Sequence, residues 1–399
     1  MSGIKVLEYA QFVAGPYCSK LLADLGAEVI KIEPPDSGDP SRKRGPFPED
    51  IPHPEKSALF LYLNTNKSGI TLNLESTMGR GIFKSLVKDV DILIEDHSPK
   101  AMKDMGLNFD ILERINPRLV MTSITPFGQT GPNAEYKCYP LNTFHSGMIG
   151  YMTPWVSSWP DREPLKSGGM LGECGCGLSA AIATLAALYA QRITMTGQHV
   201  DVSKQEALAT LARVNVTQFP NDGAGDTRFA NMSALLNDMV ICKNGYIVLQ
   251  INETHHWQGL VQLMGNPEWA QNPIYLDRRE RGNRFKTEIQ PRIREWAKDY
   301  TKEELYHKGQ ASNCPLAAVS SVEDVLNSAH TMAREFFVEF EHPQAGKVKC
   351  PGAPAKFSET PWSIENPAPL LGQHNEQVFC EKLGYSKEDM TELRRAGII

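Results

Sequence analysis

The fold is decided by residues 4–33, which read IKVLEYAQFVAGPYCSKLLADLGAEVIKIE. Apolar and polar residues alternate over 4–9, as is typical of a strand, and 28–33 repeat this β-rich pattern. Between them, Pro16 stands where a helix would begin, and residues 17–25 continue that helix. Strand, helix and strand within this short span predict a parallel βαβ unit, the opening of a doubly wound sheet.

The alternation of strands and helices continues along the first half of the chain. Further strands are predicted over residues 69–74, 91–94, 119–124 and 198–203, and further helices over 78–88 and 172–191. This order indicates an α/β fold with a doubly wound, Rossmann-like sheet. The helix over 172–191 is rich in Ala and Leu, so we expect it to be buried at the centre of the fold.

A change of composition predicts a domain boundary near residue 220. Gly, Asp and Asn dominate residues 221–226, and the CKNGY sequence of 242–246 carries a hairpin signal. We therefore predict a large α/β domain over 1–220 and a smaller α+β domain over 221–321. Residues 322–399 contain many prolines, so we expect a largely extended segment draped over other structure.

Composition and charge exclude several classes of function. Of the 399 residues, 41% are hydrophobic, and the net charge is −6, which gives no positive field to collect nucleic acid or an anionic membrane. No basic leader with an apolar stretch opens the chain, and the apolar run 178–190 is shorter than the roughly 20 residues that span a bilayer. These features predict a cytoplasmic protein that binds neither nucleic acid nor membrane.

The cysteines predict no metal site. The chain has eight, and Cys174 and Cys176 form a CxC pair without a second cluster. Such a pair is poor zinc-binding geometry, and the same holds for His255-His256. We therefore expect reduced thiols and no bound metal.

Two glycine-containing turns are candidates for the functional site. The turn over 10–16 follows the first strand but lacks GxGxxG, which argues against a nicotinamide dinucleotide there. Residues 168–177, GGMLGECGCG, place Glu173 at a helix start, where the helix dipole favours a carboxylate and glycines allow close approach. Glu173 is therefore the best nucleophile candidate; the alternative is that it only caps the helix.

Short motifs along nearly the whole chain together resemble one family, the class III CoA-transferases or CaiB–BaiF family. The resemblance implies a large doubly wound CoA-binding domain, a smaller domain, and a C-terminal segment that returns to the large domain. It also implies a dimer of two chains threaded through each other as interlocked rings. The motifs are Gly15-Pro16, DLGAEVIKIEP at 24–34, GDPSR at 38–42, LNTNK at 63–67, FGQTGP at 127–132, GQHVDVS at 197–203 and PLLGQH at 369–374.

The resemblance further implies transfer of coenzyme A from an acyl-CoA donor to a carboxylic acid acceptor, with no permanently bound cofactor. In the family, an active-site carboxylate attacks the thioester, forms a mixed anhydride and then carries CoA as an enzyme thioester. Family members have Asp where this chain has Glu173. The added methylene moves the carboxylate by roughly 1 Å, a displacement that can cost on the order of a hundredfold in rate.

Several further positions match the family's CoA and substrate site. Asp96, His97 and Ser98 replace an Asn-Phe-x sequence that holds the adenosine end of CoA, and Asp104 replaces an Arg that meets CoA phosphate. Lys100 and Lys103 are expected to compensate for that Arg. The resemblance also places one residue, Tyr139, beside the reacting centre. Along the CoA channel it places Val13, Ala14, Leu72, Asn73 and Lys137.

Three interpretations stay open. The chain is either a catalytic transferase or a non-catalytic subunit of a heteromer whose paralogous partner bears the active Asp, as in transferases that activate aryl-succinates such as benzylsuccinate. The coincident changes at Glu173, Asp96 and Asp104 favour the non-catalytic subunit. An acyl-CoA isomerase or racemase, with His145 in the proton transfer, is the third interpretation.

Overall fold

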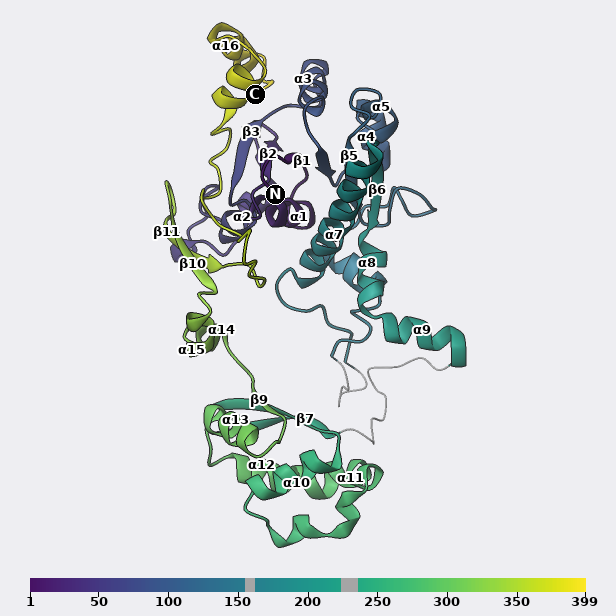
Figure 1. Ribbon diagram of the computed structural model, residues 1–399, viewed down its shortest axis with the longest axis vertical. Helices are drawn as coiled ribbons and strands as arrows, with labels where there is room; N and C mark the ends of the chain where they lie inside the picture. Colours follow the sequence, from purple (N-terminus) through teal and green to yellow (C-terminus); the bar gives the residue numbers. More distant parts are fainter. Residues whose placement is uncertain (155–161, 224–235) are drawn as a thin grey trace. The chain divides into compact units, whose positions relative to one another are not determined.

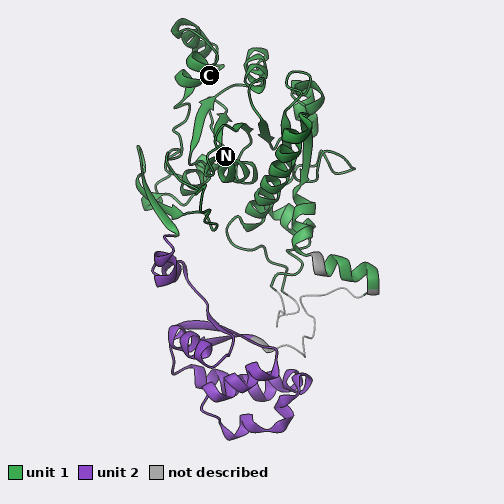
Figure 2. Ribbon diagram, viewed as in Figure 1, with its two compact units in different colours: residues 1–155, 161–228, 336–399 green, residues 156–160, 229–335 purple. Residues whose placement is uncertain are grey.

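The computed structural model describes residues 1–154, 162–223 and 236–399. These residues form two compact units (Figure 2). Unit 1 contains the first two described stretches together with residues 336–399, and unit 2 contains 236–335. Unit 1 is therefore built from stretches that precede and follow unit 2 in the sequence.

Unit 1 is built on a six-stranded sheet in the order β3-β2-β1-β4-β5-β6. All neighbouring strands are parallel, and Leu7 lies opposite both Ile30 and Leu93. This order confirms the predicted doubly wound α/β fold, in which a crevice opens between β1 and β4, where the strand order reverses. The strands are β1 Lys5–Tyr9, β2 Glu28–Glu33, β3 Lys67–Thr71, β4 Ile92–Glu95, β5 Val120–Thr125 and β6 Gln198–Ser203.

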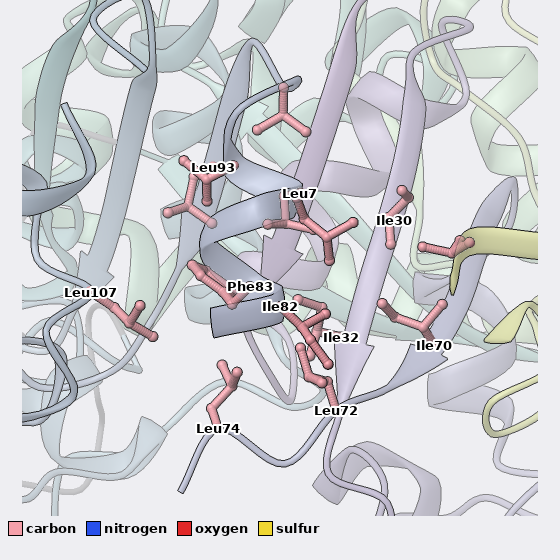
Figure 3. Packing of buried hydrophobic residues seen from close by; sticks show 14 of the residues in the cluster. Leu7, Ile30, Ile32, Ile70, Leu72, Leu74, Ile82, Phe83, Leu93 and Leu107 are labelled. Atoms are coloured by element: carbon pink, nitrogen blue, oxygen red, sulfur yellow. The ribbon is translucent and has the colours of Figure 1, made fainter. Parts of the chain in front are cut away.

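Helices cover both faces of this sheet (Figure 1). Side chains alternate along each strand, so Leu7 points into one core cluster with Ile82 and Phe83, and Val6 into the other with Leu22. Figure 3 shows the first cluster. The helices of unit 1 up to residue 223 are α1 Ala14–Ala23, α2 Ala58–Leu63, α3 Thr77–Val87, α4 Pro99–Met105, α5 Phe109–Leu112, α6 Pro140–Ser146, α7 Leu171–Thr194, α8 Lys204–Leu211 and α9 Arg213–Asp222.

Helix α7 differs from the expected fully buried helix. One face packs against α1 so closely that a Cβ on Gly177 would lie 2.5 Å from the Ala14 carbonyl oxygen. The opposite face is exposed, with Ile182 at 62%, Tyr189 at 71% and Ile193 at 67%. By length and composition the helix is apolar enough to cross a membrane, but core helices of soluble proteins pass the same test, so this is weak evidence for a span.

Unit 2 has its own small antiparallel sheet in the order β7-β8-β9, packed against helices around Trp257. The expected hairpin lies at its first turn, where Cys242 pairs with Gly245. Residues 322–335 belong to this unit, although the sequence analysis assigned them to the C-terminal segment. The elements are β7 Leu236–Cys242, β8 Gly245–Ile251, α10 Thr254–Leu263, α11 Arg278–Arg284, α12 Gln290–Ala297, α13 Lys302–Ala311, β9 Leu316–Ala318, α14 Val322–Leu326 and α15 Ala329–Ala333.

The C-terminal segment is extended only in its middle. It begins with the antiparallel hairpin of β10, Phe337–His342, and β11, Gly346–Pro351, and ends with α16, Lys387–Arg395. Its middle part caps the outer edge of β3, because the Gly69 and Thr71 amides donate to His374 Nδ1 (3.0 Å) and Asn375 Oδ1 (2.9 Å). Met390 and Leu393 of α16 belong to the same core cluster as Ile82 of α3. The segment therefore completes the core of unit 1.

Candidate active site

Three charged side chains gather at the carboxyl ends of the parallel strands. Asp96 directly follows β4, and Lys204 directly follows β6. Glu173 lies in the first turn of α7. Because α7 runs back along the sheet before β6 begins, its first turn lies at the same edge as the ends of the strands. This edge is where open α/β sheets bind their ligands.

Glu173 and Lys204 form a buried ion pair. The distance between Lys204 Nζ and Glu173 Oε2 is 2.7 Å, and the side chains are 15% and 4% exposed. Burial alone would lower the pKa of Lys204, but the carboxylates of Glu173 and Asp96 outweigh it and raise that pKa above its usual value. The lysine is therefore a lasting positive charge beside the candidate nucleophile.

Lys204 was not predicted from the sequence, although a signal was present. It is the first residue of α8, where the helix dipole disfavours a cation, and it follows a strand end directly. A lysine in that position needs an anion nearby. Its partner is 31 residues away along the chain, so only the fold identifies it.

The residues after β4 form a buried polar cluster. Asp96 Oδ2 accepts a hydrogen bond from the Gln11 amide (3.0 Å), and burial raises the pKa of Asp96 to about 7. His97 stacks on Tyr9 with ring centroids 3.9 Å apart, and burial lowers its pKa to about 4. Glu95 is fully buried, and burial raises its pKa to about 8. Glu95 Oε1, Asp96 Oδ1 and His97 Nδ1 have no hydrogen-bonding partner among the described residues.

The turn between β1 and α1 is held by two carboxylates. The Gln11 amide donates to Asp96, and the Phe12 amide donates to Asp39 Oδ1 at 3.0 Å. Phe12 has φ of +66°, an uncommon value for a bulky residue, so these bonds fix a strained turn. Val13 and Ala14, predicted to line the CoA channel, follow this turn with buried side chains.

The remaining predicted CoA positions divide into buried and exposed residues. Leu72 packs in the core of unit 1, as Figure 3 shows. The Asn73 amide donates to the Ile398 carbonyl at 2.8 Å, and Ser98 caps α4 by accepting from the Ala101 amide at 3.2 Å. These contacts give all three residues a structural role in addition to the predicted binding role.

Lys103, Lys137 and Tyr139 are exposed, Tyr139 at 76%. Cys138, directly before Tyr139, is near enough to the ion pair for the charges of Lys204 and Glu173 to act on its thiol, whose pKa is raised by burial. The loop that carries Tyr139 therefore reaches the candidate site.

His145 lies in α6, with its ring against Gly150. Within the described ranges it has no acidic hydrogen-bonding partner, so the paired acid and base of an isomerase are not seen there. Cys174 and Cys176 are not part of a larger cluster of potential metal ligands among the described residues. The described chain contains no group of three or more such residues.

A parallel sheet of this strand order, with a buried carboxylate at its carboxyl edge, defines a doubly wound α/β protein with an enzyme-like site. The chain belongs to CoA-transferase family III, whose family model matches residues 1–375. This confirms the family expected from the sequence motifs. Enzymes of this family use CoA thioesters as substrates.

Similar proteins include two enzymes and one solved structure. The chain is 33% identical to a formyl-CoA:oxalate CoA-transferase of Streptomyces coelicolor, covering 100% of this chain and 99% of the relative. It is 29% identical to a succinyl-CoA–D-citramalate CoA-transferase of Chloroflexus aurantiacus, covering 100% and 98%. A CaiB/BaiF family protein from Brucella suis has the same fold, with a TM-score of 0.83, 26% identity and coverage of 95% and 98%. These relatives do not support the narrower expectation of an aryl-succinate transferase subunit.

Proposed function

We propose that this chain transfers coenzyme A from an acyl-CoA to a small carboxylic acid, with Glu173 as the covalent nucleophile. The observation that carries the proposal is the buried Glu173 carboxylate, 2.7 Å from the Lys204 ammonium at the carboxyl edge of the sheet. A carboxylate at this edge lies where open α/β sheets bind their ligands, and it is favoured as an anion by the first turn of α7. The relatives' acids, such as oxalate and citramalate, support a small acid as acceptor.

The reaction proceeds in two balanced halves. Glu173 attacks the acyl carbonyl of the donor, CoA leaves as a thiolate, and a mixed anhydride forms; the thiolate then attacks the Glu173 carbonyl and releases the donor acid. Glu173 is now a CoA thioester. The acceptor carboxylate attacks this thioester, the thiolate leaves, and its attack on the acceptor's carbonyl yields the new acyl-CoA and the free Glu173 carboxylate.

A second candidate is a non-catalytic subunit beside a paralogue that bears the active Asp. Two features favour it: Glu173 is one methylene longer than the family Asp, and the predicted adenosine loop carries the buried, unpartnered Asp96 oxygen. Lys100, near the position of the lost phosphate-binding Arg, is already paired with Asp104 at 2.5 Å. That leaves Lys103 as the nearby lysine to meet a CoA phosphate.

The exposed face of α7 supports a partner chain for either candidate. Its apolar residues recur every three to four positions and leave a long stripe unpartnered within unit 1. We propose that a second copy or a paralogous subunit covers this stripe in the cytoplasm, as an interlocked dimer.

Mass spectrometry tests the proposal directly. The purified chain, alone and with any co-purifying partner, is incubated with oxalyl-CoA or succinyl-CoA and trapped with hydroxylamine or borohydride. We expect modification at Glu173 in the wild type and none in Glu173→Gln, while the exposed Glu206→Gln, in the first turn of α8, labels like the wild type. Labelling of a partner's Asp with none at Glu173 would identify a non-catalytic subunit, and no labelling of any chain would refute covalent transfer.

A further inference from the structure

Lys204 has an unusual environment for a buried lysine. Its ammonium has three N–H donors, yet in the described structure Nζ has one hydrogen-bonding partner, Glu173 Oε2 at 2.7 Å. Asp96 acts on it through charge, without a hydrogen bond. Two donors of a nearly buried cation are therefore left for a ligand at the edge of the sheet where the reaction is proposed.

We propose that Lys204 is the fixed counter-ion of the transfer: once Glu173 is acylated, the Lys204 ammonium binds the carboxylate of the acceptor acid. This inference rests on the proposed function, because it concerns the same site. It assigns a specificity role to a residue outside the predicted set, and it defines the acceptor as an anion.

The charge balance of the reaction supports this role. In the resting site, the negative charge of Glu173 neutralises Lys204. The mixed anhydride and the thioester of Glu173 are both uncharged, so each leaves the lysine without its partner. An unpaired buried cation is costly, and an incoming carboxylate restores the pair.

The same balance also sets the order of events. While Glu173 is ionised, it occupies the lysine, and an acceptor carboxylate would meet a like charge there. The acceptor is therefore admitted only after the donor has reacted. When transfer ends, Glu173 regains its negative charge and pairs again with Lys204. This pairing displaces the newly formed acyl-CoA from the lysine.

A binding experiment without turnover isolates this step. Glu173→Gln carries a neutral side chain of the same shape and so mimics the acylated state. We expect calorimetry to show oxalate binding at least about tenfold more tightly to Glu173→Gln than to the wild type, the size of effect typical of a buried charge pair. The double variant Glu173→Gln/Lys204→Met should lose the gain, Glu206→Gln should bind like the wild type, and the neutral analogue oxamide should show no gain.

Equal oxalate affinity in Glu173→Gln and the wild type would overturn the inference, as would a gain that survives in the double variant. Steady-state kinetics gives a second readout if Glu173→Gln folds poorly. In Lys204→Met we expect KM for the acceptor to rise on the order of a hundredfold and KM for the donor far less, whereas Lys204→Arg should restore part of the loss. Equal changes in both KM values would also overturn it.

These outcomes are separate from the test of the proposed function. Absence of any label on Glu173 refutes covalent catalysis by this chain, whatever the oxalate affinities. A labelled Glu173 with unchanged oxalate affinity refutes only the role of Lys204. Lys5→Met is the matched substitution control, since Lys5 begins β1 at the opposite edge of the sheet and pairs with exposed Asp89.

Discussion

Two of the buried lysine–carboxylate arrangements in unit 1 differ in how many of the lysine's hydrogen-bond donors are used. The first, which we call the structural network, consists of Glu8, Lys31, Asp39 and Lys67, all essentially buried. Lys31 Nζ donates to Glu8 (2.7 Å), Asp39 (2.8 Å) and the Ala10 carbonyl (3.0 Å). Lys67 likewise has three acceptors, including Glu8 Oε2 at 2.8 Å. Each ammonium in this network uses all of its donors.

The second arrangement, the site pair, is Glu173 with Lys204, in which one donor of the lysine is used. A cation with every donor satisfied holds its neighbours in place and has nothing left for a ligand. A cation with one partner can exchange that partner. The comparison indicates that the structural network fixes the β1–α1 turn through Asp39, while the site pair is suited to chemistry.

The largest expected effect is on the structural network. Lys31→Met leaves Glu8 and Asp39 buried with fewer partners, so we expect the free energy of unfolding to fall by about 3–5 kcal/mol in urea denaturation. The exposed pair of Lys5 should cost less than about 1 kcal/mol in Lys5→Met. Lys204→Met should fall between the two. If Lys204→Met destabilises as much as Lys31→Met, the site pair is structural and the distinction fails.

The second prediction tests the distinction between the two arrangements by changing the length of the side chain at position 173. Glu173→Asp withdraws the carboxylate by roughly 1 Å from Lys204, so we expect kcat/KM of acyl transfer to fall on the order of a hundredfold. Steady-state kinetics with the thermal midpoint measured in parallel would separate this loss from unfolding. A faster Glu173→Asp enzyme would mean that the longer side chain is a defect and that Lys204 contributes no positioning.

The smallest effect concerns Asp96, which neither arrangement neutralises by direct contact. Burial raises its folded pKa from 3.8 to about 7, so between these values the folded state binds more protons than the unfolded state. The contribution of Asp96 to stability is therefore lost as pH rises from about 4 to 7. Asp96→Asn keeps an oxygen for the Gln11 amide, and we expect it to be more stable than the wild type at pH 8 by at least about 1 kcal/mol.

Urea denaturation of both proteins across this pH range checks the prediction, with exposed Asp104→Asn as the control for a lost surface charge. The gain of Asp96→Asn should disappear near pH 4. A constant difference across the range would show that Asp96 is ionised in the folded protein at every pH tested.

The sheet was predictable because its strands are rich in β-branched and apolar residues, and all but one were expected within one residue of their observed bounds. The exception is β3, expected over 69–74 and found at Lys67–Thr71. Leu72 and Leu74 continue the apolar pattern because they are buried in the core, although they lie beyond the strand. The apolar pattern of the sequence indicates which residues are buried, and at β3 the buried residues continue beyond the end of the hydrogen-bonded strand.

The candidate site was predictable only in part. Glu173 was identifiable because glycines and a helix start surround it in the sequence itself. Lys204 depends on a pairing made by the topology of α7 and β6, which local sequence does not encode. Several polar motifs that identified the family, such as GDPSR at 38–42, prove to be buried structural contacts: Arg42 binds Glu33 and the Pro369 carbonyl.

The cap on the edge of β3 has a consequence for the synthesis of this protein. The amide of Gly69 finds its partner, His374, 305 residues later in the chain. At about 5–20 residues per second, the ribosome takes roughly 15–60 s to make that stretch. After β6 has been made, all six strands exist, yet the outer amides of β3 remain open to pairing with any other exposed strand until residue 374 is reached. The nascent chain is therefore most exposed to aggregation while unit 2 is being translated, and a chaperone that shields strand edges would help it most at that stage.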